Sequence, residues 1–251
     1  MNTEERLMRY LREHSPLVIL FSGGVDSTVL AALAGRAGAE MLALTVDNCM
    51  LSAGEVERAG AEASELGVEH EVLKVDMLSS PAAQNTPERC YHCKRAMILA
   101  AGQLRPDWQL AEGTNVSELK DARAGMRAVH ELGVLSPYLE LGVGKDEIRR
   151  LAEQMGLSCS SQPSNACLAT RIPCGEPITK KRLKQIGRAE HALKEMGFFQ
   201  VRVRAHGTLA RLELGQDEIE RAVEERAEIV QRLKAVGFSR VCLGLEGYVE
   251  K

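Results

Sequence analysis

The length, composition and charge of the chain exclude several classes of protein. With 251 residues, 45% of them hydrophobic, the chain can bury one large core or two smaller ones, so it is not a small scaffold that depends on disulfides. Its formal net charge is -3, from 32 basic and 35 acidic residues, so no global positive field indicates nucleic acid as the main partner.

The N-terminal residues 1–14 are charged and amphipathic, and no uninterrupted apolar stretch of about 18 residues occurs there or elsewhere. We therefore expect neither a signal peptide nor a membrane span, and a cytoplasmic protein. In that setting, seven cysteines argue against a complete disulfide framework and favour metal binding or thiol chemistry. Cys49 and Cys242 lie in or beside apolar runs without a cysteine neighbour, which is typical of buried thiols.

From Pro16 to about Gly156, short apolar runs alternate with longer segments of helical periodicity, the pattern of a parallel sheet wrapped by helices. The expected strands are 17–21, 41–46, 71–75 and 108–111. The expected helices are 27–37, 53–66, 90–104, 122–132 and 145–155. The pattern predicts a doubly wound α/β domain over residues 1–157, whose ligands bind beyond the carboxyl ends of the strands.

The segment between the first expected strand and helix reads SGGVDS, residues 22–27. Gly23 and Gly24 let the backbone approach an anion, while Ser22 and Ser27 offer hydroxyls and the helix points its positive end at the same place. The segment lacks the Lys-Ser/Thr ending of the P-loop that grips a β/γ-phosphate. It resembles the PP-loop of ATP pyrophosphatases, which cleave ATP between the α- and β-phosphates and adenylate a substrate. That resemblance implies that Asp26 helps to bind Mg²⁺, for which a carboxylate is a suitable ligand.

Two further segments end at the same edge of the predicted sheet. Asp47 follows the second strand and is a candidate for nucleoside binding. Glu112, Gly113, Thr114 and Asn115 follow the fourth strand, and the glycine and small polar groups of this segment suit contact with phosphate or adenine. Both segments are also typical of ordinary turns.

Residues 158–179 have little periodicity and contain three cysteines, so we expect a functional cysteine loop there. The pattern then changes to a helix over 181–196, strands over 200–205 and 209–214, a helix over 217–236 and a strand over 240–245. This order predicts a smaller α+β domain over residues 180–251, for substrate binding and oligomerisation.

A CxxC motif, Cys90 to Cys93, stands at the start of an expected helix, where the helix N-terminus and neighbouring cations favour thiolates. Cys167 supplies a third thiol from the cysteine loop, with Cys159 and Cys174 on either side of it. Three thiolates on an iron–sulfur cluster would leave one iron free to bind an exogenous sulfide. A structural zinc site would instead take a fourth ligand from Cys174, Cys159 or His92. The spacing leaves both sites open.

With these motifs the chain resembles the LarE family, the sulfur transferases that make the nickel-pincer cofactor of lactate racemase. The likeness covers nearly the whole chain and rests on SGGVDS, on the loop from Cys167 to Gly175, and on residues 200–206 and 210–214. It implies that ATP adenylates a carboxylate of a pyridinium biscarboxylate mononucleotide, and that sulfur then displaces AMP to leave a thiocarboxylate.

The family's loop cysteine, here Cys167, handles the sulfur, either by giving up its own or by holding a cluster that carries sulfide. Because this chain has Cys90 and Cys93, the resemblance implies a [4Fe-4S] cluster held by these two residues and Cys167. Cys174 departs from the family pattern, which often has an aromatic residue at that position.

Arg202 and Arg204 alternate along an expected strand, so they project from the same face, where two guanidiniums can hold phosphate or carboxylates. The resemblance implies that both bind the anionic substrate. It implies further substrate contacts and a homo-oligomer, and the additional contact residues are Thr170, Arg171, Glu190 and Glu213.

The sequence leaves three alternative functions open. A tRNA thiolase also pairs a PP-loop with a three-cysteine cluster, but it needs a basic nucleic-acid surface. An amide-forming synthetase leaves the cysteines unexplained. A non-catalytic nucleotide- or metal-binding module would bind ATP without releasing AMP. The sulfur donor is not indicated by the sequence.

Overall fold

A computed structural model describes residues 1–118, 124–161 and 166–248. The chain divides into two compact units. The first comprises Met1–Ala82 and Glu88–Asn165, and the second comprises Ala83–Pro87 and Ala166–Lys251. Part of the expected cysteine loop, residues 162–165, and the first two residues of the helix expected over 122–132 lie outside the described residues, as do 249–251.

The first unit is built on a parallel sheet whose strand order is β3-β2-β1-β4. The strands are β1 (Leu17–Leu20), β2 (Met41–Asp47), β3 (His70–Lys74) and β4 (Gln109–Ala111). The helices are α1 (Thr3–Glu13), α2 (Val25–Arg36), α3 (Glu55–Leu66), α4 (Arg89–Leu104), α5 (Ala124–Glu131), α6 (Pro137–Glu140) and α7 (Lys145–Gln154). The predicted α/β fold class is therefore confirmed.

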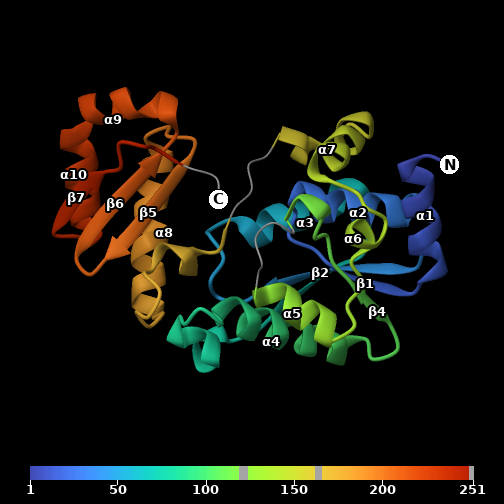
Figure 1. Cartoon of the computed structure of the whole chain (residues 1–251). Coiled ribbons are helices and arrows are strands. Elements are labelled where there is room, and N and C mark those ends of the chain that lie inside the picture. The colour runs from blue at the N-terminus through green and yellow to red at the C-terminus, as the bar shows by residue number, and fades with distance from the viewer. Residues whose placement is uncertain (119–123, 162–165, 249–251) are drawn as a thin grey trace. The chain divides into compact units, whose positions relative to one another are not determined.

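Alternate side chains of the strands pack against helices on opposite faces of the sheet. Leu17 and Ile19 of β1 join one core with residues of α1, α2 and α7. Val18, between them, packs with Leu42 of β2 and Ala101 of α4 in a second core. In Figure 1 the helices α1, α2, α3 and α7 lie on one side of the sheet, and α4 and α5 on the other. Both faces being covered explains why these strands read as continuous apolar runs.

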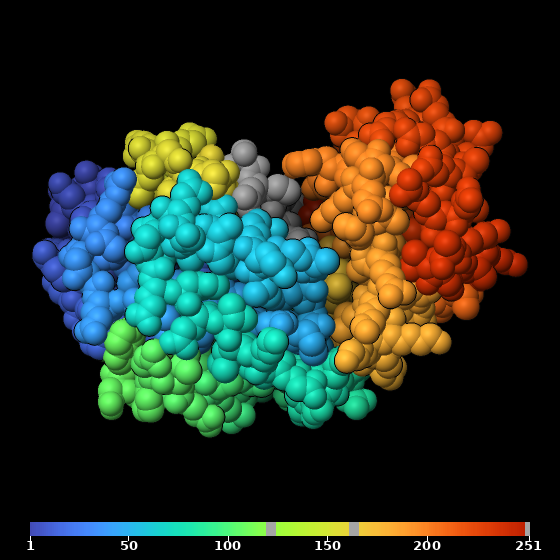
Figure 2. Space-filling model, turned by 180° about the vertical axis from the view of Figure 1, so that it is seen from behind, coloured from blue at the N-terminus to red at the C-terminus, as the bar shows by residue number. Residues whose placement is uncertain are grey.

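The helices also shield the sheet from solvent. In the space-filling view, blue and cyan residues from the first half of the chain form most of the first unit's face that is turned away in Figure 1 (Figure 2). In the sheet itself, Val18, Leu42 and Leu44 are fully buried. Only the carboxyl edge of such a sheet is left for a ligand.

The second unit is a small mixed sheet with helices. It contains α8 (Lys180–Glu195), β5 (Val201–His206), β6 (Leu209–Leu214), α9 (Ile219–Glu224), α10 (Arg226–Ala235) and β7 (Arg240–Leu243). Strands β5 and β6 form an antiparallel hairpin, and β7 pairs with β6 in parallel. Helix α8 packs against β5 and α10.

The single helix predicted over residues 217–236 is wrong, because the chain bends at Glu225 between α9 and α10. Arg221 of α9 donates to the carbonyls of Met196 and Gly197 and to the carboxylate of Glu225, which fixes the direction of the shorter helix. The apolar repeat does not mark the bend, since the buried Ala222, Ile229 and Leu233 are seven and four residues apart and would share one face of a continuous helix.

The expectation of buried thiols at Cys49 and Cys242 is also wrong, because both are exposed. Cys49 lies in a turn after β2 with a φ of 58°, and Cys242 lies on β7, an edge strand whose residues alternate between exposed and half-buried. The cysteine that is fully buried is Cys159.

Residues 83–87 belong to the second unit although they lie far from it in sequence. The Asn85 side chain, itself fully buried, donates to the carbonyl oxygens of Pro173 (2.7 Å) and Glu176 (3.0 Å). The backbone of Ala83 accepts from the N–H of Ile178 at 2.8 Å. This short segment therefore forms part of the support of the cysteine loop.

In residues 1–118, 124–161 and 166–248, no helix combines the length and the apolarity that crossing a membrane requires.

Candidate functional site

The SGGVDS segment forms the turn from β1 into α2. Gly23 has a φ of 68°, and a Cβ there would lie 2.8 Å from the Cα of Ala59, so only glycine fits. The Ser27 hydroxyl donates to the Gly24 carbonyl at 3.1 Å and accepts from the Ser22 N–H at 3.2 Å. The loop is thus shaped by its own hydrogen bonds.

Helix α2 begins beside this loop without a side-chain cap among the described residues. Its Gly24 N-cap has no side chain to accept the first N–H groups, which leaves donors at the positive end of the helix for an anion. A triphosphate fits this cradle on two observations: the glycine that a Cβ would fill and the uncapped helix start.

A cavity of about 260 Å³ opens next to the loop at the carboxyl edge of the sheet. Its wall includes Ser22, Asp26 and Ser27 from the loop, and Gly113 and Thr114 from the segment after β4. Apolar residues of β1 and β2 add surface of the kind that an adenine ring requires, and charged side chains, among them Lys94 and Glu112, line part of the remainder. The structure therefore brings together five of the residues predicted to bind ATP.

Asp26 is contacted by three elements of the first unit. Its Oδ2 atom lies 2.5 Å from the Lys145 Nζ, and its Oδ1 accepts from the Asn115 side chain at 3.2 Å. Its backbone carbonyl accepts from the Tyr138 hydroxyl at 2.9 Å. A Cβ at Gly113 would crowd Asp26 at 3.2 Å, so the segment after β4 approaches the loop as closely as backbone allows.

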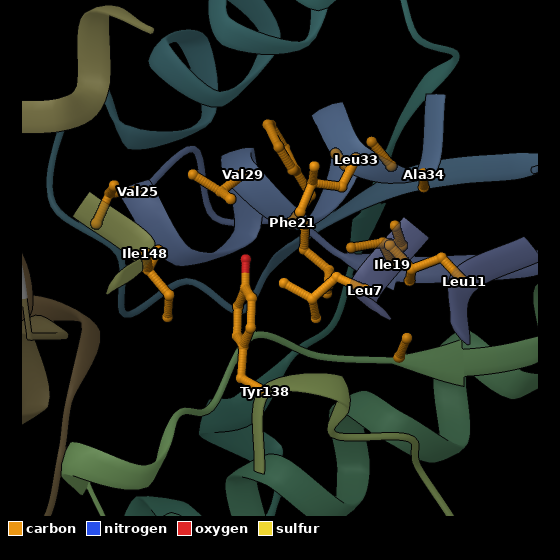
Figure 3. Packing of buried hydrophobic residues seen from close by; sticks show 14 of the residues in the cluster. Leu7, Leu11, Ile19, Phe21, Val25, Val29, Leu33, Ala34, Tyr138 and Ile148 are labelled. Carbon is orange, nitrogen blue, oxygen red and sulfur yellow. The ribbon is translucent and has the colours of Figure 1, made fainter. Parts of the chain in front are cut away.

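Tyr138 supports the loop from beneath. It is fully buried in the core between α2 and α7, and Figure 3 shows its hydroxyl directed at α2, near Val25 and Val29, with Ile148 of α7 beside it. Burial and the nearby Asp26 carboxylate raise the pKa of Tyr138 well above its usual value, so the hydroxyl stays protonated as a donor. The position of Asp26 is therefore fixed by the core.

Glu112 is a second buried carboxylate at the cavity. Its exposed fraction is 3%, and it accepts from Lys94 Nζ (2.9 Å), Thr114 Oγ1 (2.6 Å) and Ser136 Oγ (3.0 Å). Burial pushes the pKa of Glu112 up, but the Lys94 charge and these hydrogen bonds outweigh it, so the net pKa lies below the ordinary value. The carboxylate is ionised and paired.

The predicted residues Asp47 and Asn115 take part in local turns. The Asp47 carboxylate accepts from the Cys49 N–H at 3.1 Å, and Asp47 is not among the residues that line the described cavity. The Asn115 side chain accepts from the Ser117 N–H at 3.1 Å in addition to its contact with Asp26. Asn115 thereby links the Asp26 carboxylate to the segment after β4.

Sequence reasoning missed Lys145 and Tyr138 as parts of this site. It placed Glu112 at the edge where ligands bind, because Glu112 directly follows a strand, but gave it no separate role. Lys145 reads only as the start of a helix, and Tyr138 as part of a short apolar run, so no local signal indicates either.

The CxxC cysteines are the second and fifth residues of α4, three apart and so on neighbouring positions of its surface. Cys90 is exposed, and its Sγ lies 3.7 Å from an Arg89 guanidinium nitrogen. Cys93 is half-buried, 3.7 Å from the side-chain amide of Asn48. Both thiols thus have a nitrogen donor near the sulfur, at the N-terminal end of a helix.

The structure does not test the expected three-cysteine cluster. The described residues contain no group of three or more His, Cys, Asp or Glu side chains arranged to hold a metal ion. Cys90 and Cys93 belong to the first unit and Cys167 to the second.

In the second unit, Cys167 directly precedes a turn held by a buried ion pair. Arg171, whose side chain is 1% exposed, donates to Glu190 Oε1 at 2.9 Å and to the Ala166 carbonyl at 2.7 Å. Glu190 Oε1 also accepts from the Val203 N–H of β5 at 3.0 Å. Arg171 and Glu190, both predicted to contact substrate, are thus paired with each other and shape the backbone on either side of Cys167.

Arg204 extends the same network. It contacts Glu213 at 2.6 Å and donates to the Thr170 carbonyl at 3.0 Å. Burial pushes the pKa of Glu213 up, but hydrogen bonding and charge from Arg204, with a smaller contribution from Arg211, lower it overall. The network therefore joins the predicted substrate residues of β5 and β6 to the turn that follows Cys167.

Arg202 differs from this network. Its guanidinium lies over the Tyr248 ring, 4.2 Å from the centroid, and forms no ion pair or hydrogen bond with any residue in the described part of the chain. Partial burial, which is the main cause, lowers the pKa of Arg202. A half-buried cation in this state is suited to bind an anion.

Comparison with known proteins adds three relatives that match along most of their length. Residues 16–93 match the family model described as queuosine biosynthesis protein QueC. An uncharacterized protein of Synechocystis is 36% identical, over 97% of this chain and 94% of its own length. An uncharacterized protein of Methanocaldococcus jannaschii is 29% identical, over 94% and 92% respectively. The pyridinium-3,5-bisthiocarboxylic acid mononucleotide synthase of Lactiplantibacillus plantarum is 28% identical, over 96% and 90%.

Proposed function

Since the chain belongs to the LarE family of PP-loop proteins, we propose that it is an ATP-dependent sulfurtransferase acting on pyridinium-3,5-biscarboxylic acid mononucleotide in nickel-pincer cofactor synthesis. The observation that carries the proposal is the glycine-shaped cradle at the uncapped start of α2. It is supported by 28% identity to the Lactiplantibacillus plantarum synthase along nearly the whole chain.

ATP binds with its phosphates at Ser22–Ser27 and its adenine in the cavity at the strand ends. A substrate carboxylate oxygen attacks the α-phosphorus, the bond to the bridging oxygen breaks, and pyrophosphate leaves with that electron pair. The product of this step is an acyl-adenylate. Asp26 supplies a carboxylate for Mg²⁺, which offsets the charge that builds up on the pyrophosphate.

Sulfur then attacks the activated carbonyl carbon, and AMP leaves with the electrons of the acyl–oxygen bond. Cys90, Cys93 and Cys167 would hold a [4Fe-4S] cluster, which supplies the sulfide when bound. Arg202 contributes the cation that receives the substrate's phosphate or carboxylate. Arg171 and Glu190 keep the loop of Cys167 in shape.

The test is anaerobic purification, iron analysis and a turnover assay with the pyridinium substrate and Mg·ATP. We expect about four iron atoms per chain after reconstitution, AMP and pyrophosphate in equal amounts, and a thiocarboxylate detected by mass spectrometry. Cys167→Ser should lose the thiocarboxylate product, whereas Cys242→Ser, at an exposed cysteine on β7, serves as the matched control.

Three results would overturn parts of the proposal. An iron-free protein whose Cys167 loses its sulfur after one turnover would replace the cluster by a sacrificial cysteine. Sulfur transfer to unmodified tRNA, with none to the pyridinium compound, would instead identify a tRNA thiolase. ATP binding without AMP release on any substrate would identify a non-catalytic module.

A further inference from the structure

The geometry points to Lys145 as a stand-in for the divalent metal at Asp26: its ammonium blocks the carboxylate until a nucleotide arrives, so that metal and ATP bind together. This inference rests on the proposed role of Asp26 as a metal ligand. It adds a positioning residue that couples the two binding events.

Both oxygens of the Asp26 carboxylate are already engaged. Oδ2 lies 2.5 Å from the Lys145 ammonium, and Oδ1 accepts from Asn115 at 3.2 Å. The side chains of Asp26 and Lys145 are 23% and 25% exposed, so the pair is only partly screened by water. A free Mg²⁺ ion would have to displace this ammonium and then remain close to its positive charge.

The backbone of Asp26 is fixed by contacts on two sides. The Tyr138 hydroxyl holds its carbonyl from the core side, and Gly113 is packed against it from the other. A metal ion bound by Asp26 must therefore occupy a position beside the carboxylate as it lies in this structure.

Lys145, by contrast, is free to move its charge without moving its backbone. It is the first residue of α7, and its N–H donates to the Ser117 hydroxyl at 3.1 Å. Ser117 is itself bound through its N–H to Asn115 at 3.1 Å. Lys145 is thus held through its backbone, while its four-carbon side chain carries the ammonium and can change rotamer.

A bound triphosphate makes the metal ion, instead of the Lys145 ammonium, the favoured partner of the Asp26 carboxylate. Its oxygens give the metal several ligands besides Asp26, as Mg²⁺ sites formed by one or two carboxylates and phosphates require. They also give the Lys145 ammonium a new anionic partner. Each ligand thus favours the other, and by linkage the coupling is equal in both directions.

The experiment measures Mn²⁺ binding by electron paramagnetic resonance, with Mn²⁺ alone and then with the non-cleavable analogue α,β-methylene-ATP. In Lys145→Met, Mn²⁺ alone should bind on the order of tenfold more tightly than in the wild type, and the tightening of Mn²⁺ binding by the analogue should shrink by a similar factor. Lys145→Arg keeps the charge and should behave as the wild type. Asp26→Asn should abolish the effect of Lys145→Met.

Thermal melting of each variant checks that it is folded, and Lys145→Gln provides a second neutral side chain. Unchanged Mn²⁺ affinity in both neutral variants would overturn the inference, as would equal tightening in the Asp26→Asn background. Because the readout needs neither the pyridinium substrate nor sulfur, these results are separate from the turnover assay. Failure of the sulfur-transfer proposal would leave this coupling intact.

Discussion

The phosphate loop of the first unit and the cysteine loop of the second are held in place by different means. The phosphate loop is shaped by backbone: Gly23 at a positive φ, Gly113 in close approach and the start of α2. The turn after Cys167 is shaped by side chains, above all the buried pair of Arg171 and Glu190. A backbone-built site is visible in a sequence as glycines at fixed positions, whereas a side-chain network joins residues that no short motif connects.

The comparison predicts that the second unit is the more sensitive to loss of one charge. Arg171→Met would leave Glu190 buried without its cation, and we expect the free energy of unfolding to fall by about 3–5 kcal/mol. Urea denaturation measures the loss. Arg232→Met is the matched control, since its partner Glu228 is exposed, and it should cost less than about 1 kcal/mol.

A double variant sharpens the same point. Arg171→Met combined with Glu190→Leu removes both charges, so part of the lost stability should return. If the double variant loses as much unfolding free energy as the two single variants together, the loss comes from the hydrogen bonds to Ala166 and Val203 instead.

The phosphate loop should be most sensitive to an added methyl group. Gly23→Ala places a Cβ against the backbone of Ala59, and we expect the KM for ATP to rise more than about tenfold, which corresponds to about 1.4 kcal/mol of lost binding. Gly38→Ala is an unusually close control, because Gly38 has the same φ of 68° but open space around it. Gly38→Ala should lower stability by about 1 kcal/mol and leave the KM unchanged.

A smaller effect should follow from removing the hydrogen bond that supports the phosphate loop from the core. Tyr138→Phe removes the hydroxyl that holds the Asp26 carbonyl, which should reduce stability by about 1 kcal/mol and weaken Mn²⁺–nucleotide binding. Calorimetry and metal titration measure the two effects. Tyr10→Phe, which removes an exposed hydrogen bond to Glu140, should leave metal binding unaltered.

The smallest expected effect is on pH dependence, and it compares the two regions directly. The folded-state pKa of Glu112 lies below its ordinary value of 4.5, so the stability from its ionised form is present above that pH and is lost as the pH falls through the folded-state pKa. Glu112→Gln should therefore flatten the fall in unfolding free energy below about pH 5. Glu213→Gln should do the same less strongly, because Glu213 is the more exposed of the two. An unchanged slope in Glu112→Gln would contradict the assignment of a paired, ionised carboxylate.

Much of the fold and part of the site are readable from the sequence, for physical reasons. Strands β1 and β2 are continuous apolar runs because both of their faces are covered, whereas the burial of β5 and β6 alternates along the hairpin. Glycines of the phosphate loop are forced by sterics, so the motif predicts its geometry. Lys145 lies 119 positions from Asp26, and their contact depends on how α7 packs on α2, which local periodicity does not specify. Asn85 and the bend at Glu225 escape prediction for the same reason.

The segment 83–87 has a practical consequence for anyone who divides the chain. A fragment that starts at Ala166 would contain residues 166–179 of the cysteine loop but not Asn85, and the carbonyls of Ile172, Pro173 and Glu176 would lose their shared amide donor. The complementary fragment would keep Asn85 but would lack these three carbonyls. The second unit is thus formed by two separate segments of the chain, and a fragment meant to reproduce it must also include residues 83–87.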